Sequence, residues 1–142
     1  MRYWLFKSEP NTWSWDDQVA KADEGEPWDG VRNYQARNNM RAMEVGDLGF
    51  FYHSVNEKRI VGVVEVIAEA AQDPTTEDPR WECVTIKALG PFETPVTLAD
   101  CKEAPELADM ILVNNSRLSV QPVTEAEWKL LCKMGGYSGK GA

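Results

Sequence analysis

A tryptophan followed by spaced arginines is the part of this sequence best suited to ligand chemistry. Trp28 precedes Asp29-Gly30, and Arg32, Arg37 and Arg41 follow it. An indole at a loop-to-helix junction can stack on a planar ligand, and stacking of a base on an aromatic ring contributes about 1–3 kcal/mol. Arginines near one edge of a helix would suit phosphate groups. The alternatives are a tryptophan of the core and arginines paired with nearby carboxylates on a solvated face.

Catalytic and metal-binding signals are weak in comparison. His53 is the single histidine of the chain, and a general base needs a partner within hydrogen-bond reach. The sequence has no G-x-S-x-G, P-loop or H-E-x-x-H motif. Its cysteines are odd in number and widely spaced, which argues against a disulfide framework and a zinc site. We therefore expect no catalytic residue, no metal, no cofactor, and idle thiols in a reducing compartment.

Charge is divided unevenly along the chain. The 142 residues carry 15 Lys and Arg against 23 Asp and Glu, which gives a net charge of −8. Non-specific affinity for nucleic acid comes from many phosphate contacts, so this balance excludes a generically basic binder. Residues 28–43, however, hold three arginines and one aspartate, a net +2 that leaves −10 for the remainder. Any nucleic-acid role must therefore rest on a local site.

Helix signals predict the elements that position these residues. Ala36, Met40 and Met43 form an inward stripe that predicts a helix over residues 32–43. A further short helix is expected over 105–112. Capping boxes predict two more helices, one through about residue 22 and one from 125 to 134 with Gly135 as its stop. The capping pairs are Ser14 with Asp17 and Thr124 with Glu127.

Strand signals complete the predicted architecture. Strands are expected over 3–7, 48–54, 60–70, 81–89 and 117–120. In the strand over 60–70, Glu65 and Glu69 predict one side that faces solvent. Pro91 and Pro95 predict loops or edges. Without regular alternation of strands and helices, this pattern predicts an α+β fold with about five or six mostly antiparallel strands in a barrel-like sheet flanked by short helices.

The chain length suits a single domain. We assign that domain to residues 1–134 and expect the glycine-rich residues 135–142 to form a flexible tail. No apolar run approaches the ~18 residues that a membrane helix needs, and no signal-peptide pattern opens the chain. We therefore expect a cytoplasmic protein, or a nuclear one if the source is eukaryotic.

Four segments, in the same order along the chain, closely resemble motifs of the EVE domain family. The match covers nearly the whole chain, and its motifs are long enough to be highly specific. The segments are Tyr3–Pro10, Trp28–Asn38, Phe51–Ser54 and Arg117–Val123. The resemblance implies a PUA-like pseudo-barrel related to the YTH domain. It also implies binding of modified bases, especially modified cytosines in DNA, in an aromatic-lined pocket.

The resemblance also implies roles for individual residues. Trp28 would form one wall of the base pocket. The pocket would be lined or supported by Lys7, Ser8, Asn33 and Tyr34. Phosphates would approach Arg32 and Arg37. Arg41 joins this group because it lies on the same predicted helix. The rim of the pocket, or the layer behind it, would contain His53, Arg117 and Glu9.

We therefore expect a non-catalytic module that binds nucleic acid carrying a modified base, in DNA rather than RNA, without a membrane partner. Two other classes stay open. One is an enzyme that acts on a nucleotide or modified base with His53 and Glu9 as its acid–base pair. The other is an adaptor whose acidic surface meets a basic protein. The resemblance favours a bacterial cytoplasmic protein, because the basic N-terminal extension of vertebrate nuclear members is not present in this sequence.

Overall fold

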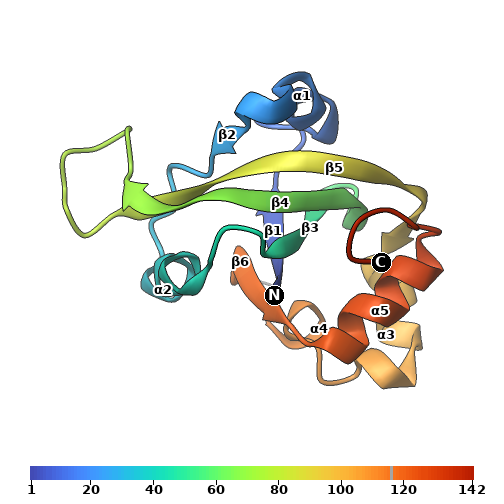
Figure 1. The fold of residues 1–142 in the computed structure, drawn as a ribbon. Helices are drawn as coiled ribbons and strands as arrows, with labels where there is room; N and C mark the ends of the chain where they lie inside the picture. The colour runs from blue at the N-terminus through green and yellow to red at the C-terminus, as the bar shows by residue number, and fades with distance from the viewer. Residues whose placement is uncertain (116) are drawn as a thin grey trace.

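A six-stranded sheet organises the chain in a computed structural model that describes residues 1–115 and 117–142. The spatial strand order is β2-β5-β4-β3-β1-β6, so β2 and β6 are the edges of an open sheet (Figure 1). β1 pairs with β3 in parallel and the other pairings are antiparallel. The predicted α+β class is confirmed. The strands are β1 (Tyr3–Ser8), β2 (Glu26–Pro27), β3 (Leu48–His53), β4 (Arg59–Gln72), β5 (Glu82–Thr97) and β6 (Val120–Val123).

Short helices flank this sheet. Figure 1 shows α1 and α2 on opposite sides of the long β4–β5 hairpin, with α3 and α5 together near the C-terminus. Both predicted capping boxes are formed, from Ser14 and from Thr124, and a third begins at Thr97. The helices are α1 (Trp15–Ala20), α2 (Tyr34–Ala42), α3 (Leu98–Glu103), α4 (Ile111–Asn114) and α5 (Glu125–Met134), with 3₁₀ turns η1 (Ala22–Glu24) and η2 (Pro105–Leu107).

The apolar interior forms two clusters on opposite faces of the sheet. Along β1, Leu5 belongs to one cluster, whereas Trp4 and Phe6 belong to the other. Successive side chains of a strand point to opposite faces, so the sheet lies between the clusters. The Leu5 cluster contains Trp128 of α5. The Trp4 cluster contains Trp28 and the predicted α2 stripe, Ala36, Met40 and Met43, all of it buried.

Prolines end the strands less firmly than the sequence predicts. β5 continues through Pro91 and Pro95, because the β4–β5 pairing shifts register near these positions and bulges tolerate a residue without an N–H. β6 starts at Val120 rather than 117 and includes Pro122, which an edge strand accommodates. The helix predicted over 105–112 is divided into the 3₁₀ turn at Pro105–Leu107 and α4.

Residues 135–142, expected to be a flexible tail, pack against the Leu5 face. Tyr137 is buried, and the Trp128 indole N–H donates to the carbonyl of Gly141 over 2.8 Å. The Lys140 ammonium contacts Glu65 of β4, and Lys87 lies 3.9 Å from the same carboxylate. Glu65 was expected on a solvent-facing side but is only 8% exposed, because the returning chain covers it and lysines neutralise its charge.

Candidate functional site

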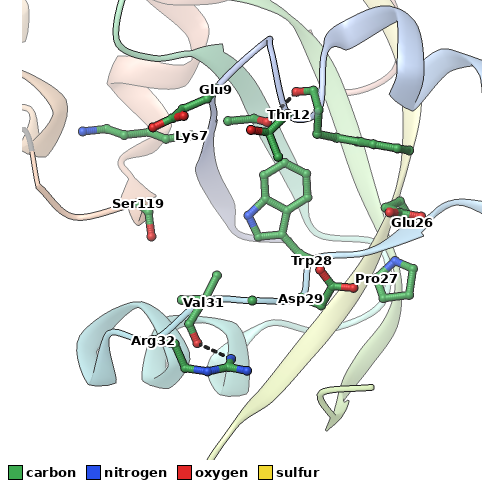
Figure 2. A pocket seen from close by; sticks show the side chains of 13 residues that line it. Lys7, Glu9, Thr12, Glu26, Pro27, Trp28, Asp29, Val31, Arg32 and Ser119 are labelled. Atoms are coloured by element: carbon green, nitrogen blue, oxygen red, sulfur yellow. Dashed lines mark hydrogen bonds between the residues drawn. The ribbon is translucent and has the colours of Figure 1, made fainter. Parts of the chain in front are cut away.

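A cavity of about 590 Å³ opens where β1 ends, beside the segment that leaves β2 (Figure 2). β1 ends at Ser8 before Pro10, and the short β2 is followed directly by Trp28. Two tryptophans, two cations and three carboxylates contribute to the wall, so it combines stacking surfaces with charged groups of both signs. The lining residues are Lys7, Ser8, Glu9, Thr12, Trp13, Glu26, Pro27, Trp28, Asp29, Gly30, Val31, Arg32 and Ser119.

Trp28 is both a core residue and a cavity wall. Figure 2 shows its indole in the middle of the lining side chains. Its ring meets Phe6 and Phe51 edge-on, with centroid distances of 5.5 and 5.7 Å, and only 8% of the residue is exposed. The backbone N–H of Trp28 donates to the carbonyl of Val84 over 2.8 Å, and this hydrogen bond fixes the Trp28 backbone beside β5. The wall is therefore rigid before any ligand arrives.

Trp13 is a second aromatic lining residue, and it was not among the residues predicted for the pocket. Its indole N–H donates to the Gln18 side chain over 3.0 Å. The Ser8 hydroxyl donates to the Trp13 carbonyl over 2.5 Å, so Ser8 supports this wall as well as lining the cavity. Trp13 lies in the loop between Pro10 and the capped start of α1, and no local pattern separates such a loop tryptophan from one of the core.

Asp73 holds the part of the cavity wall formed by Gly30 and Arg32. The sequence reasoning gave Asp73 no role. Its carboxylate accepts hydrogen bonds from the Gly30 N–H over 2.9 Å, from Arg32 over 3.0 Å and from Thr75 over 2.6 Å. Burial would raise the pKa of Asp73, but these hydrogen bonds outweigh it and lower the pKa to about 2. Gly30 has φ +78, a left-handed conformation that favours glycine. Asp73 therefore holds the turn that joins Trp28 to Arg32.

The charged groups of the wall offer both hydrogen-bond donors and acceptors. Burial lowers the pKa of Lys7, whose ammonium lies 5.9 Å from the centroid of the Tyr52 ring. Burial and the charge of Asp73 raise the pKa of Asp29, while Arg32 opposes that rise. An ionised carboxylate accepts hydrogen bonds and an ammonium donates them. Asp29 can thus read the polar edge of a planar ligand, whereas the Lys7 ammonium is directed away from Trp28, toward Tyr52 of the Leu5 cluster (Figure 2).

Two residues predicted for the base pocket, Asn33 and Tyr34, are not among its lining residues. Asn33 is the N-cap of α2, and its side-chain oxygen accepts the Ala36 N–H over 2.8 Å. Tyr34 is 50% exposed and stacks on Trp81 with a centroid distance of 5.0 Å. Both follow Arg32 directly in the chain, which explains why the motif suggested the pocket.

The three predicted phosphate-binding arginines occupy different surroundings. Arg32 lines the cavity and pairs with Asp73 at 3.0 Å. Arg37 donates to the Arg80 carbonyl and to the Asn38 side chain, both uncharged acceptors. Arg41 lies 2.5 Å from the Glu82 carboxylate, as the alternative of a solvated ion pair predicted for it.

His53 positions α1 rather than lining the cavity. The Trp15 N–H donates to His53 Nε2 over 3.0 Å, so Nε2 is unprotonated, and Nδ1 donates to Glu57 over 2.9 Å. Both ring nitrogens are therefore engaged, and the acid partner is Glu57 instead of the expected Glu9. Glu9 itself lines the cavity. Arg117 is exposed in the loop before β6, outside the lining set.

The described part of the chain contains no group of three His, Cys, Asp or Glu side chains able to hold a metal ion. Nor does it contain a helix long and apolar enough to cross a membrane. All three cysteines are buried and free, and burial raises the pKa of Cys83 to about 12. None of the three cysteines is among the lining residues of the cavity, which include tryptophans, carboxylates and cations.

Comparisons with known proteins identify the family and relatives of the same fold. The model of the EVE domain family matches residues 2–134. Human thymocyte nuclear protein 1 is 32% identical over 93% of this chain and 73% of its own length. The crystal structure of a protein from Agrobacterium tumefaciens superposes with a TM-score of 0.94 and 55% identity, covering 96% of this chain and 94% of that one.

Two further solved structures contain nucleic acid. Human THYN1 in complex with DNA containing 5-methylcytosine is similar with a TM-score of 0.87 and 31% identity, covering 95% of this chain and 98% of that one. A YTH domain of Zygosaccharomyces rouxii, in complex with N6-methyladenosine RNA, is 17% identical with a TM-score of 0.57, covering 94% of this chain and 85% of that one. The YTH likeness is one of fold.

Proposed function

This chain belongs to the EVE domain family, and on that premise we propose that it is a non-catalytic module that binds DNA carrying a modified cytosine. One extruded base would enter the cavity and stack against Trp28. Trp13 would contribute a second aromatic surface and Asp29 would contact the polar edge of the base, while Lys7 would stay at the border of the cavity. The relative bound to 5-methylcytosine DNA supports this choice of ligand.

The single observation that carries the proposal is the Trp28 wall of the cavity. Ligand pockets in proteins measure about 300–1,000 Å³ and combine apolar walls with a few polar groups. The cavity of about 590 Å³ lies within that range. The edge-on contacts of Trp28 with Phe6 and Phe51 hold its ring in place, so little entropy is lost when a base stacks on it.

The physics of base extrusion sets what affinity and selectivity to expect. Extruding a base costs a few kcal/mol in a duplex and least where the base is mismatched or already single-stranded. Burying one additional methyl group contributes about 0.8 kcal/mol, which corresponds to roughly a fourfold preference. We therefore expect tighter binding to single strands than to duplexes, with modest discrimination between methylated and plain cytosine.

The proposal is tested by titrating labelled single-stranded DNA, with and without 5-methylcytosine, and following fluorescence anisotropy. Trp28→Ala should weaken binding by about 5- to 150-fold, the value of one stacked base. Trp28→Phe keeps an aromatic partner for Phe6 and Phe51, and should retain the fold with intermediate affinity. Unchanged affinity in a folded Trp28→Ala protein would refute the pocket.

A second measurement avoids substitution altogether. In ¹H–¹⁵N spectra, the indole signals of the lining residues Trp13 and Trp28 should shift when the methylated strand is added. The indoles of Trp4 and Trp128 donate to Asp47 and to the Gly141 carbonyl, and neither lines the cavity. Their signals are internal controls. Shifts confined to the control pair would place the ligand elsewhere.

A further inference from the structure

A stack of planar side chains lies beside the cavity and is not explained by a pocket for one base. We call it the Tyr34–Trp81 cluster, made of Arg32, Tyr34, Arg37, Arg80 and Trp81. The two rings are stacked at 5.0 Å with an interplanar angle of 26°. The Arg32 guanidinium lies 5.3 Å from the Trp81 ring centroid, and that of Arg37 lies 4.9 Å from the Tyr34 centroid.

The cluster is held in place by its own hydrogen bonds yet remains open to solvent. Arg80 donates to the Tyr34 hydroxyl over 3.3 Å, and Arg37 donates to the Arg80 carbonyl over 2.9 Å. Tyr34 nevertheless keeps 50% of its surface exposed, which makes it one of the few large side chains with an apolar ring left on the outside. A stack that is already ordered and partly exposed can accept a planar ligand with little further loss of side-chain entropy.

The cluster also carries positive charge that the protein does not neutralise. Arg32 pairs with Asp73 and Arg80 pairs with Asp78. Arg37, in contrast, forms no ion pair with any carboxylate of residues 1–115 or 117–142. On a molecule of net charge −8, an arginine with only neutral partners can pair with a phosphate without first giving up a carboxylate.

Arg32 connects the cluster to the cavity. The same side chain lines the cavity and lies over Trp81. Tyr34 follows Arg32 by two residues, so their Cα atoms are at most about 7.6 Å apart. The two sites are therefore close enough to bind neighbouring nucleotides of one strand.

We propose that the Tyr34–Trp81 cluster is a second stacking site, which binds the base next to the extruded one in the same DNA strand. Bases stack on aromatic rings and on guanidinium planes alike, and the cluster presents both. The phosphate between the two nucleotides would lie near Arg37. This inference rests on the proposed function, and it moves Tyr34 from the base pocket to a separate subsite.

Three probes separate stacking at the cluster from binding in the cavity. The first is 5-methyldeoxycytidine monophosphate. The second is a five-nucleotide strand with 5-methylcytosine at its centre and thymines around it. The third is the same strand with abasic sites in place of the thymines, which keeps the phosphates and removes the flanking bases. Affinities are measured for the full chain by calorimetry or competition.

The wild-type protein should bind the thymine-flanked strand about 5- to 150-fold more tightly than the abasic-flanked strand. Tyr34→Ala should abolish that difference and leave the monophosphate and the abasic-flanked strand unchanged. Tyr34→Phe should retain it, because the ring remains. Val19→Ala, which truncates another exposed apolar side chain, is the matched control and should change none of the three affinities.

The outcomes distinguish the two proposals. If the protein binds all probes and Tyr34→Ala keeps the preference for flanking bases, the second stacking site is refuted while the cavity proposal survives. If Tyr34→Ala weakens all probes equally, Tyr34 belongs to the base pocket instead. If the wild-type protein binds none of the probes, both proposals fail.

Discussion

Arg37 and Arg41 look equivalent in the sequence, one helical turn apart on α2, but they are not equivalent in the structure. Arg41 is neutralised by Glu82, whereas Arg37 donates to uncharged acceptors. Surface ion pairs contribute about 0–1 kcal/mol to stability, so the Arg41 pair adds little to the fold. Because Arg41 is already paired with Glu82, it is less available than Arg37 to bind a phosphate of the proposed DNA ligand.

Arg37→Gln should therefore reduce the salt dependence of DNA binding, while Arg41→Gln should not. For single strands, each phosphate contact contributes about −0.7 to the slope of log K against log salt, so the slope should become shallower by about 0.7 in Arg37→Gln. The check is a set of titrations at several salt concentrations. Equal slopes in both variants would mean that Arg37 contacts no phosphate.

The lowered pKa of Asp73 predicts that the folded protein loses stability in acid. Its pKa is lowered from 3.8 to about 2 in the folded protein, so its ionised form stabilises the fold. That contribution is complete above about pH 4 and is lost as the pH falls through about 2. Asp73→Asn should be less stable than wild type near pH 7, by on the order of 2 kcal/mol, and the two should converge in acid.

Urea unfolding measured across this pH range tests the role of Asp73. Parallel stability curves for wild type and Asp73→Asn would show that the carboxylate carries no such linkage. Asp78, whose pKa is also lowered to about 2 by its bonds with Arg80, is present in both proteins and contributes to both curves alike. The difference between the proteins therefore isolates Asp73.

Helices and strands that depend on residues close in sequence were predicted correctly. Features that depend on pairing between distant strands were not. The Ser14 and Thr124 capping boxes and the stripe of α2 depend on residues three or four apart, and all of them are formed. The course of β5 through Pro91 depends instead on bulges in its pairing with β4. No pattern within 81–97 encodes those bulges.

The cavity follows the same division. Trp28 was predictable because a tryptophan, a glycine turn and arginines are adjacent in the sequence. The role of Asp73 depends on a contact across 43 residues with Gly30, and Trp81 reaches Tyr34 from the far end of the β4–β5 hairpin. Such partners are set by strand pairing, which is why a single sequence does not identify them.

Gly62 of β4 fixes how closely α1 approaches the sheet. A Cβ at this position would lie 2.5 Å from the Trp15 ring, so Gly62→Ala must displace the start of α1. Overpacking of this kind costs about 1–3 kcal/mol. Because Trp13 lies in the loop just before α1 and lines the cavity, the variant should also bind the methylated strand more weakly.

Gly90→Ala is the matched control for Gly62→Ala. Gly90 lies opposite Val63 in the neighbouring strand, and a Cβ there would meet only Tyr137 at an ordinary distance of 3.4 Å. Thermal unfolding and the affinity for the methylated strand are compared for both variants. If the two alanines behave alike, contact between Gly62 and Trp15 does not position α1.

At the scale of the whole molecule, the net charge of −8 bears on how the proposed ligand would bind. Glu9, Glu26 and Asp29 border the cavity beside Lys7 and Arg32, and the rest of the surface is acidic overall. A long track of phosphate contacts would therefore contribute little, and in the proposed complex the affinity would come from the stacked bases. We expect bare duplex DNA to bind weakly and to dissociate readily as salt rises.

The C-terminal residues are predicted to stabilise the fold without serving the cavity. Deleting 135–142 removes the buried Tyr137, the Trp128–Gly141 hydrogen bond and one of the two lysine partners of Glu65, Lys140. Burial of a large apolar side chain alone contributes about 1.5–3 kcal/mol, so the melting temperature should fall clearly. Affinity for the methylated strand should not change, because Trp128 and Trp28 belong to different clusters.

Differential calorimetry of the truncated and full chains, with titrations well below both melting temperatures, separates the two effects. Lys140→Gln is the milder companion variant, which removes the cation beside Glu65 and leaves the tail in place. An unchanged melting temperature after truncation would support the flexible tail expected from the glycine-rich sequence.

The sheet that separates the two apolar clusters also separates two kinds of evolutionary constraint. Residues of the Leu5 cluster, such as Phe92 and Tyr137, are constrained by packing, and we expect volume-conserving replacements to be tolerated there. Residues of the Trp4 cluster, such as Phe6 and Phe51, also hold the Trp28 ring in position. If the proposed pocket is correct, the half of the domain that contains Trp28 is expected to change more slowly among homologues than the other half.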